Sequence, residues 1–176
     1  MIRTEIGIDL NKAKLLLDSS DIISIPTETV YGLAANGKDP LAISKIYTAK
    51  KRPLSNPLIL HYKDATSAFS DITSISKEAE LLAEKFWPGP LTMLLPKKNT
   101  ISDAVTSGKP LVAVRVPDHQ LCIALLNKLD YPLAAPSANL YGRISPTSPA
   151  HVHEQLNSRI PYILDGGICE KGLEST

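Results

Sequence analysis

The side chains best suited to chemistry in this sequence lie in polar loops that follow short apolar runs. One such loop, Pro26-Thr27-Glu28-Thr29-Val30-Tyr31-Gly32-Leu33, comes directly after the apolar run Ile22–Ile25. Its Thr-Glu-Thr triplet gives a strand end several hydroxyl and carboxylate groups. The same triplet is typical of a helix N-cap with a glutamate in the first turn, where the helix dipole favours it. Both interpretations remain open.

A second loop gathers cations. It reads Lys50-Lys51-Arg52-Pro53-Leu54-Ser55-Asn56-Pro57, and it closes one expected helix and opens an expected strand. Three cations in the last turn of a helix offset the helix dipole, which explains many such runs without a ligand. The following Pro-Leu-Ser-Asn-Pro segment, however, fixes the backbone more firmly than a solvated charge run requires. A functional loop and a simple helix end both remain open.

Two further stretches place polar side chains beside apolar runs. Arg115 lies within Val112–Val116, and an arginine there needs an acidic partner or a cleft, because burying it unpaired is expensive. Ser137 and Asn139 lie in a proline-bounded turn that offers short donors and acceptors, although ordinary turn chemistry selects the same residue types. The remaining polar stretches are Gly142–Thr147, Asp165–Gly167 and Gly172–Thr176.

Several familiar kinds of site are missing from the sequence. It contains no GxxxxGK[ST] phosphate loop, no GxGxxG after a strand and no HExxH. The close histidine pair, His151 and His153, fits a solvated helix face better than a metal site. Cys122 and Cys169 belong to no CxxC pair, which argues against structural zinc and a disulfide scaffold. Four scattered histidines define no Ser-His-Asp order.

Short strands alternating with helices must position these loops. Such alternation predicts an α/β or α+β layer fold. Fourteen prolines, clustered where loops are expected, argue against a regularly wound sheet. Apolar runs predict strands over Ile22–Ile25, Pro57–Tyr62, Leu91–Leu95, Leu111–Val116, Tyr131–Ala135 and Pro161–Leu164. Capping residues and apolar spacing predict helices over Asn11–Asp18, after Asp39-Pro40, after Ser76, over Asp118–Leu129 and from Ser148 to Asn157.

Length and charge set outer bounds on the class of protein. The 176 residues suffice for one domain, which needs no disulfide or metal to bury a core. A formal charge of +1 argues against non-specific adhesion to nucleic acid or anionic lipid. Charged residues through the first twenty positions argue against a signal peptide, and no apolar run approaches the ~20 residues of a membrane span. We therefore expect a cytoplasmic protein with no membrane contact.

Six ordered blocks together resemble the YrdC/Sua5 family, the threonylcarbamoyl-AMP synthases that begin N6-threonylcarbamoyladenosine modification of tRNA. The blocks are PTETVYGL, KKRPLSNPLILH, WPGPLT, VAVRVP, APSAN and GLEST, spread from Pro26 to Thr176. The SNPLILH segment is more similar to the longer Sua5-type branch of the family than to the short YrdC type. The resemblance implies an α/β (α+β) fold: an open, twisted, mixed β-sheet with flanking helices and a large concave face, YrdC/RibB-like.

The resemblance also implies a reaction. L-threonine, bicarbonate and ATP give L-threonylcarbamoyladenylate and pyrophosphate, which makes the enzyme a nucleotidyltransferase. Such chemistry depends on positioning and on neutralising phosphate charge. The family's KxR and SxN pairs fall on Lys50 with Arg52 and on Ser137 with Asn139, the implied catalytic residues. The implied ATP-binding residues are Lys50, Arg52, Asn56, Asn139 and Thr147. The implied threonine-binding residues are Thr29, His61, Arg115, Ser137 and Ser175.

Within that set, the guanidinium of Arg115 is expected to bind the threonine carboxylate in a bidentate manner. We prefer this role to a buried ion pair. For His61 a satisfied strand-end histidine remains an alternative. Mg²⁺ is expected on the ATP phosphates, with no protein carboxylate named as its ligand. The partners implied are the downstream tRNA threonylcarbamoyl-transfer machinery and tRNA itself. A double-stranded RNA or tRNA-binding module without catalysis is the rival function.

We expect residues 1–176 to form a single catalytic domain, ending before the family's last strand and a phosphate-contacting arginine, with no second domain present. Slow turnover is expected for that reason.

Overall fold

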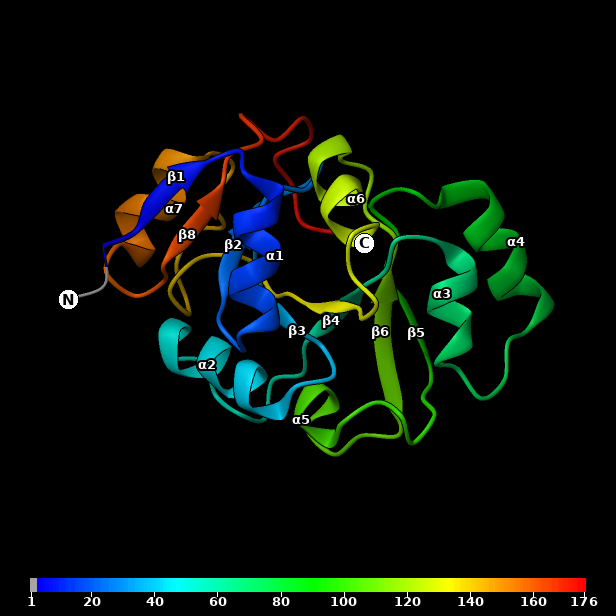
Figure 1. The fold of residues 1–176 in the computed structure, drawn as a ribbon. Helices are drawn as coiled ribbons and strands as arrows, with labels where there is room; N and C mark the ends of the chain where they lie inside the picture. Colours follow the sequence, from blue (N-terminus) through cyan, green and yellow to red (C-terminus); the bar gives the residue numbers. More distant parts are fainter. Residues whose placement is uncertain (1–2) are drawn as a thin grey trace.

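Eight strands form one mixed β-sheet in the order β1-β8-β2-β3-β7-β4-β6-β5 (Figure 1). The computed structural model describes residues 3–176. The pairs β1–β8, β2–β8 and β4–β6 are parallel, whereas β2–β3, β3–β7, β4–β7 and β5–β6 are antiparallel. The strands are β1 (Glu5–Gly7), β2 (Ile23–Ile25), β3 (Gly32–Asn36), β4 (Ile59–His61), β5 (Met93–Pro96), β6 (Leu111–Arg115), β7 (Leu133–Ala134) and β8 (Tyr162–Leu164). The expected open, mixed sheet is confirmed.

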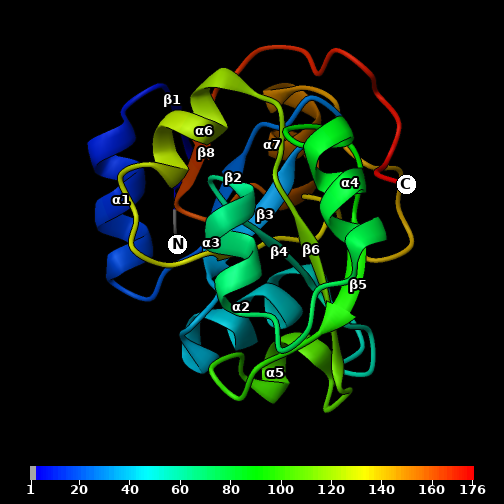
Figure 2. The same cartoon turned by 90° about the vertical axis from the view of Figure 1, so that its right-hand side faces the viewer.

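Seven helices of the described chain flank this sheet (Figures 1 and 2). Their predicted N-caps are in place: Asp39 accepts from Leu41 N, Ser76 from Ala79 N and Ser148 from His151 N. A capping side chain of this kind satisfies a donor that the helix itself leaves free. The helices are α1 (Leu10–Asp18), α2 (Pro40–Lys50), α3 (Ala65–Ser70), α4 (Lys77–Phe86), α5 (Asp103–Thr106), α6 (Gln120–Leu126) and α7 (Pro149–Leu156).

Helices cover the sheet unevenly. Along β5 and β6, Met93, Val112 and Val114 are buried in the core. Their neighbours on the opposite face are more open, since Leu94 is 62% exposed and Ala113 is partly exposed. Strand residues alternate between faces, so Arg115 lies on the same face as Ala113. The β4–β6 register places His61 directly beside Arg115. Both side chains therefore lie on the face that Leu94 and Ala113 share, although each is itself only 3% exposed.

Four elements are absent from the sequence prediction: β1, β3, α3 and α5. The helix N-cap interpretation of Thr27-Glu28-Thr29 is wrong, because the segment leads into strand β3 rather than into a helix. Gly32-Leu33-Ala34-Ala35-Asn36 lacks β-branched and aromatic residues, so no strand signal stands out. Its small side chains suit a central strand buried on both sides.

The predicted helix over Asp118–Leu129 is shorter in the structure, where α6 covers only Gln120–Leu126.

Within residues 3–176, every helix is too short or too polar to cross a membrane.

Candidate functional site

One small cleft on the open face of the sheet is lined by all five residues assigned to threonine. Its volume is about 50 Å³. Thr29 comes from the loop before β3, His61 from β4 and Arg115 from β6, while Ser137 follows β7. The full lining is Thr27, Thr29, Val30, Gly32, Ile59, His61, Arg115, Ala135, Pro136, Ser137, Glu174 and Ser175. Residues from Thr27 to Ser175 thus converge on one place.

Arg115 is held by an ion pair in the floor of this cleft. Its Nη2 lies 2.7 Å from Oε1 of Glu28, and both side chains are almost fully buried. Nη2 also donates to Thr29 Oγ1 at 3.0 Å, and Nε donates to the Gly89 carbonyl at 3.1 Å. The buried ion pair that we set aside for Arg115 is therefore present, and its contact with the threonine carboxylate stays a prediction. Three of the five guanidinium N–H groups already have protein partners, so the free fork that we expected is not available.

His61 lines the same cleft, and one of its ring nitrogens, Nδ1, has no hydrogen-bond partner among the described residues. Its side chain is 3% exposed, and Nδ1 is buried. Burial, together with the neighbouring Arg115 charge, lowers the pKa of His61 to about 3. The imidazole is therefore neutral at pH 7. A buried polar atom without a partner costs free energy that a ligand would recover, which favours a ligand at Nδ1. The satisfied strand-end histidine stays the alternative, because backbone hydrogen bonds at Ile59 and Leu133 also act on the pKa of this ring.

The segment Gly172–Thr176 contributes Glu174 and Ser175 to the lining of the cleft. Thr176 N donates to the Pro90 carbonyl at 3.1 Å, and Thr92 N donates to the Thr176 carbonyl at 2.9 Å. Thr92 Oγ1 also bonds Ser175 Oγ at 2.9 Å. The WPGPLT block therefore has two visible roles: Gly89 accepts from Arg115, and Pro90 and Thr92 dock the segment that carries Ser175.

Lys50 lies behind the cleft and not in it. Its side chain is 1% exposed, and Nζ donates to the Ser137 carbonyl, to the Asn139 carbonyl at 2.6 Å and to Asn139 Oδ1 at 3.4 Å. Burial lowers the pKa of Lys50 to about 7, with Arg52 adding to that shift. The three oxygen acceptors favour the ammonium form, which has three N–H donors to match them. Lys50 thus joins the KxR block to the SxN block.

The other residues assigned to ATP surround the loop that follows Ser137. Arg52 Nε and Nη2 donate to the carbonyls of Asn56 and Pro57 at 3.2 and 3.0 Å. Asn56 Nδ2 reaches Tyr141 Oη at 3.1 Å. Thr147 Oγ1 lies 3.3 Å from His151 Nδ1 at the start of α7. Next to Thr147 is a larger depression of about 530 Å³, lined by Leu140, Arg143, Ile144, Ser145, Pro146, His151, Glu154 and Gln155.

Three residues important to this geometry are not among the site residues assigned from the sequence: Glu28, Thr92 and Tyr31. Glu28 holds Arg115, although the two lie 87 positions apart. Tyr31 Oη donates to the Gly167 carbonyl at 2.7 Å and accepts from Gly166 N at 3.0 Å, which ties the Asp-Gly-Gly loop to the cleft. All three belong to the matching blocks, but nothing in the local sequence indicates their long-range partners.

Carboxylates for a metal ion are scarce around the site. Across residues 3–176, no group of three or more His, Cys, Asp or Glu side chains is arranged to hold a metal. Glu28 is occupied by Arg115 and the Asp118 amide, and Glu174 accepts from Ser145 Oγ. These residues do not form a protein cage for Mg²⁺.

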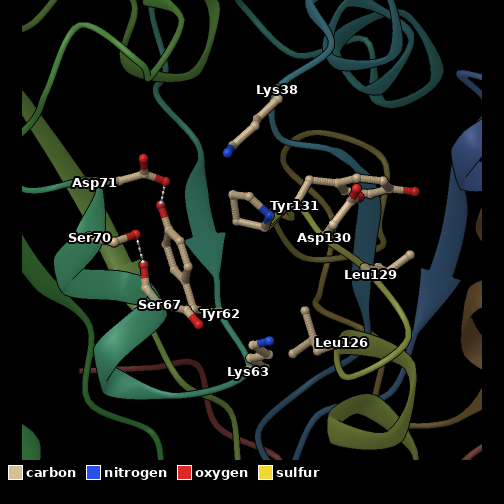
Figure 3. A pocket seen from close by; sticks show the side chains of 11 residues that line it. Lys38, Tyr62, Lys63, Ser67, Ser70, Asp71, Leu126, Leu129, Asp130 and Tyr131 are labelled. Carbon is tan, nitrogen blue, oxygen red and sulfur yellow. Dashed lines mark hydrogen bonds between the residues drawn. The ribbon is translucent and has the colours of Figure 1, made fainter.

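A second cavity of about 160 Å³ shares no residue with the cleft (Figure 3). It lies between α3, α6 and the loop before β7, and Tyr62 forms one wall. The Tyr62 hydroxyl donates to Asp71 Oδ2 at 3.0 Å, and Thr100 donates to Asp71 Oδ1 at 2.9 Å. None of the predicted site residues lines this cavity.

Comparison with known proteins gives a consistent result. The sequence model of Sua5, YciO and YrdC proteins, described as "Telomere recombination", matches residues 15–176. Threonylcarbamoyl-AMP synthase of Bacillus subtilis (strain 168) is 48% identical over 167 residues, which are 94% of this chain and 48% of that protein. The synthase of Vibrio vulnificus (strain YJ016) is 35% identical over 93% of this chain and 89% of its own length.

Among solved structures, Sua5 of P. abyssi complexed with L-threonine superposes with a TM-score of 0.93 at 40% sequence identity. The match covers 100% of this chain and 53% of that one. The chain thus spans about half the length of its long relatives. The higher identity to these long relatives than to the short Vibrio protein agrees with the Sua5-type wording of the second block.

Proposed function

The chain belongs to the Sua5/YciO/YrdC family, and from that premise we propose that its cleft binds L-threonine for adenylation as a carbamate. The overall reaction proposed is the formation of L-threonylcarbamoyladenylate, pyrophosphate and water from L-threonine, bicarbonate and ATP, a nucleotidyl transfer. The relatives that carry the synthase name and the relative solved with L-threonine support this reaction. They support the rival RNA-binding module less, because neither name nor title refers to RNA.

The observation that carries the proposal is the convergence of Thr29, His61, Arg115, Ser137 and Ser175 on one small cleft. Hydroxyl groups, a neutral imidazole and a guanidinium are groups that suit an amino acid with a hydroxyl side chain. The unpartnered Nδ1 of His61 supports a bound polar ligand, since it has no partner in the described chain. We assign threonine to this cleft on that basis.

On the nucleotide side, we propose that ATP lies along the loop between Asn139 and Thr147, next to Arg52 and Asn56. The carboxylate oxygen of the threonine carbamate attacks the α-phosphorus, and the bond from that phosphorus to the pyrophosphate oxygen breaks. Arg52 retains Nη1 for a phosphate oxygen, because its other nitrogens bond the loop carbonyls. Direct contact of Lys50 with the triphosphate remains a prediction, and it requires the ammonium to leave the carbonyls of Ser137 and Asn139.

Mg²⁺ would enter with ATP and be held by phosphate oxygens and water, where it neutralises phosphate charge. Every other contribution proposed here comes from the side chains of the chain itself. We further propose that the product passes to the tRNA threonylcarbamoyl-transfer machinery and that the protein works in the cytoplasm.

Calorimetric titration with amino acids tests the assignment. L-threonine should bind, and L-valine, which replaces the hydroxyl by a methyl group, should bind far more weakly because the buried polar groups of the cleft would lose their partner. Ser137→Ala should weaken threonine binding, whereas Ser74→Ala, at an exposed position before α4, should not. Equal binding of valine and threonine would contradict the assignment.

A further inference from the structure

The contacts of Arg115 divide its guanidinium into a bound part and a free part. Nε and both hydrogens of Nη2 are directed to Gly89, Glu28 and Thr29. Nη1 makes no hydrogen bond to the described residues and is not one of the buried atoms left without a partner. Because Arg115 lines the cleft, Nη1 is the nitrogen left for a ligand.

The Glu28 side chain is buried next to the cleft, and hydrogen bonds to both of its oxygens restrict its position. It is 2% exposed, and its second oxygen, Oε2, accepts from Asp118 N at 3.0 Å. Its carbonyl accepts from Lys171 N at 2.8 Å, next to the segment Gly172–Thr176. The carboxylate is therefore fixed from two sides, and it holds one edge of the guanidinium.

We propose that Glu28 is a positioning residue: it holds Arg115 by Nη2 so that Nη1 alone faces the cleft and receives the carboxylate of the amino-acid substrate. This inference rests on the proposed function and adds to it the residue that orients the carboxylate contact. The Glu28–Arg115 pair has no net charge. Recognition of the substrate carboxylate by this pair therefore depends on the direction of the Nη1 hydrogens. A displaced guanidinium would point those hydrogens away from the substrate.

Two substitutions separate position from charge. Glu28→Asp keeps the negative charge but withdraws it by one methylene, so it cannot reach both Arg115 and the Asp118 amide. Glu28→Gln keeps the shape but removes the charge. We expect Glu28→Asp to raise the KM for threonine by about tenfold or more, the loss of one charge-assisted hydrogen bond, while the KM for ATP stays within about twofold. Glu28→Gln should raise the KM for threonine less than Glu28→Asp does.

Asp71→Glu is the matched control. Asp71 is also a buried acid with two hydrogen-bond donors, and it lies in the second cavity (Figure 3), away from the cleft. This substitution likewise moves a buried carboxylate by one methylene without changing the charge. It should lower the temperature of unfolding but leave both KM values unchanged.

A measurement on the unaltered chain covers the case in which Glu28→Asp does not fold. With ¹⁵N-labelled arginine, added threonine should shift the Nη1 resonances of Arg115 and leave Nε and Nη2 nearly in place. The proposal is overturned if Glu28→Asp leaves the KM for threonine unchanged, if it raises both KM values equally, or if threonine shifts Nη2 as much as Nη1. Failure of the unaltered chain to bind threonine at all would instead contradict the proposed function.

Discussion

His61 makes the stability of this protein depend on pH in a direction that can be worked out. The pKa of His61 is about 3 in the folded chain, because of burial and the Arg115 charge, and about 6.5 in an unfolded chain. Between these values the unfolded chain binds one proton more than the folded chain does. The free energy of unfolding therefore falls as the pH falls below 6.5. The fall amounts to about 1.4 kcal/mol per pH unit, or about 2 kcal/mol at pH 5.

Urea unfolding of the parent chain and of His61→Gln, at pH 7, 6 and 5, measures this contribution. His61→Gln is expected to be less stable at pH 7 but to lose about 2 kcal/mol less than the parent on going to pH 5. If the parent and His61→Gln lose the same free energy, or if the His61 ring titrates near pH 6.5, the neutral buried imidazole is wrong.

Three further substitutions test other contacts of the site. Lys50→Met leaves the carbonyls of Ser137 and Asn139 without a donor, which destabilises the fold, but it also removes the cost of burying an ammonium. Urea unfolding should show a net loss of about 2 kcal/mol in the free energy of unfolding. Arg52→Lys keeps the charge but loses the planar fork, so pyrophosphate release should slow by about thirtyfold, or about 2 kcal/mol, in a folded protein. Tyr31→Phe removes two hydrogen bonds to the Asp-Gly-Gly loop and should cost about 1–2 kcal/mol of stability. An unchanged midpoint of unfolding for Tyr31→Phe would contradict that role.

The sequence predicts those parts of the fold whose signals are local. Helix α2 begins at Asp39-Pro40 and α4 after Ser76, because capping chemistry and apolar spacing act within a few residues. Strand β1 is missed because its Glu-Ile-Gly sequence contains no apolar run, and β3 because it is built mostly from small side chains. Such strands form because they pair and pack with neighbouring strands of the sheet, and the local sequence does not indicate which strands those are.

The same distinction applies to the site. The resemblance placed five residues in one cleft, which the structure supports geometrically, but it assigned each residue to a ligand and none to a neighbour. The Glu28–Arg115 pair and the Lys50 contacts with Ser137 and Asn139 join residues more than 80 positions apart. Pairings at that separation depend on the sheet order, which the sequence pattern alone does not provide.

Isotope labelling of the product tests the central claim most directly. The protein is incubated with ATP, Mg²⁺, L-threonine and ¹³C-bicarbonate, and the nucleotides are analysed by mass spectrometry. The account predicts a threonine-containing adenylate that carries the ¹³C label, formed together with pyrophosphate and absent when threonine or bicarbonate is omitted. Pyrophosphate release that is independent of threonine and bicarbonate, or a folded protein that binds threonine but never forms the labelled adenylate, would contradict the account.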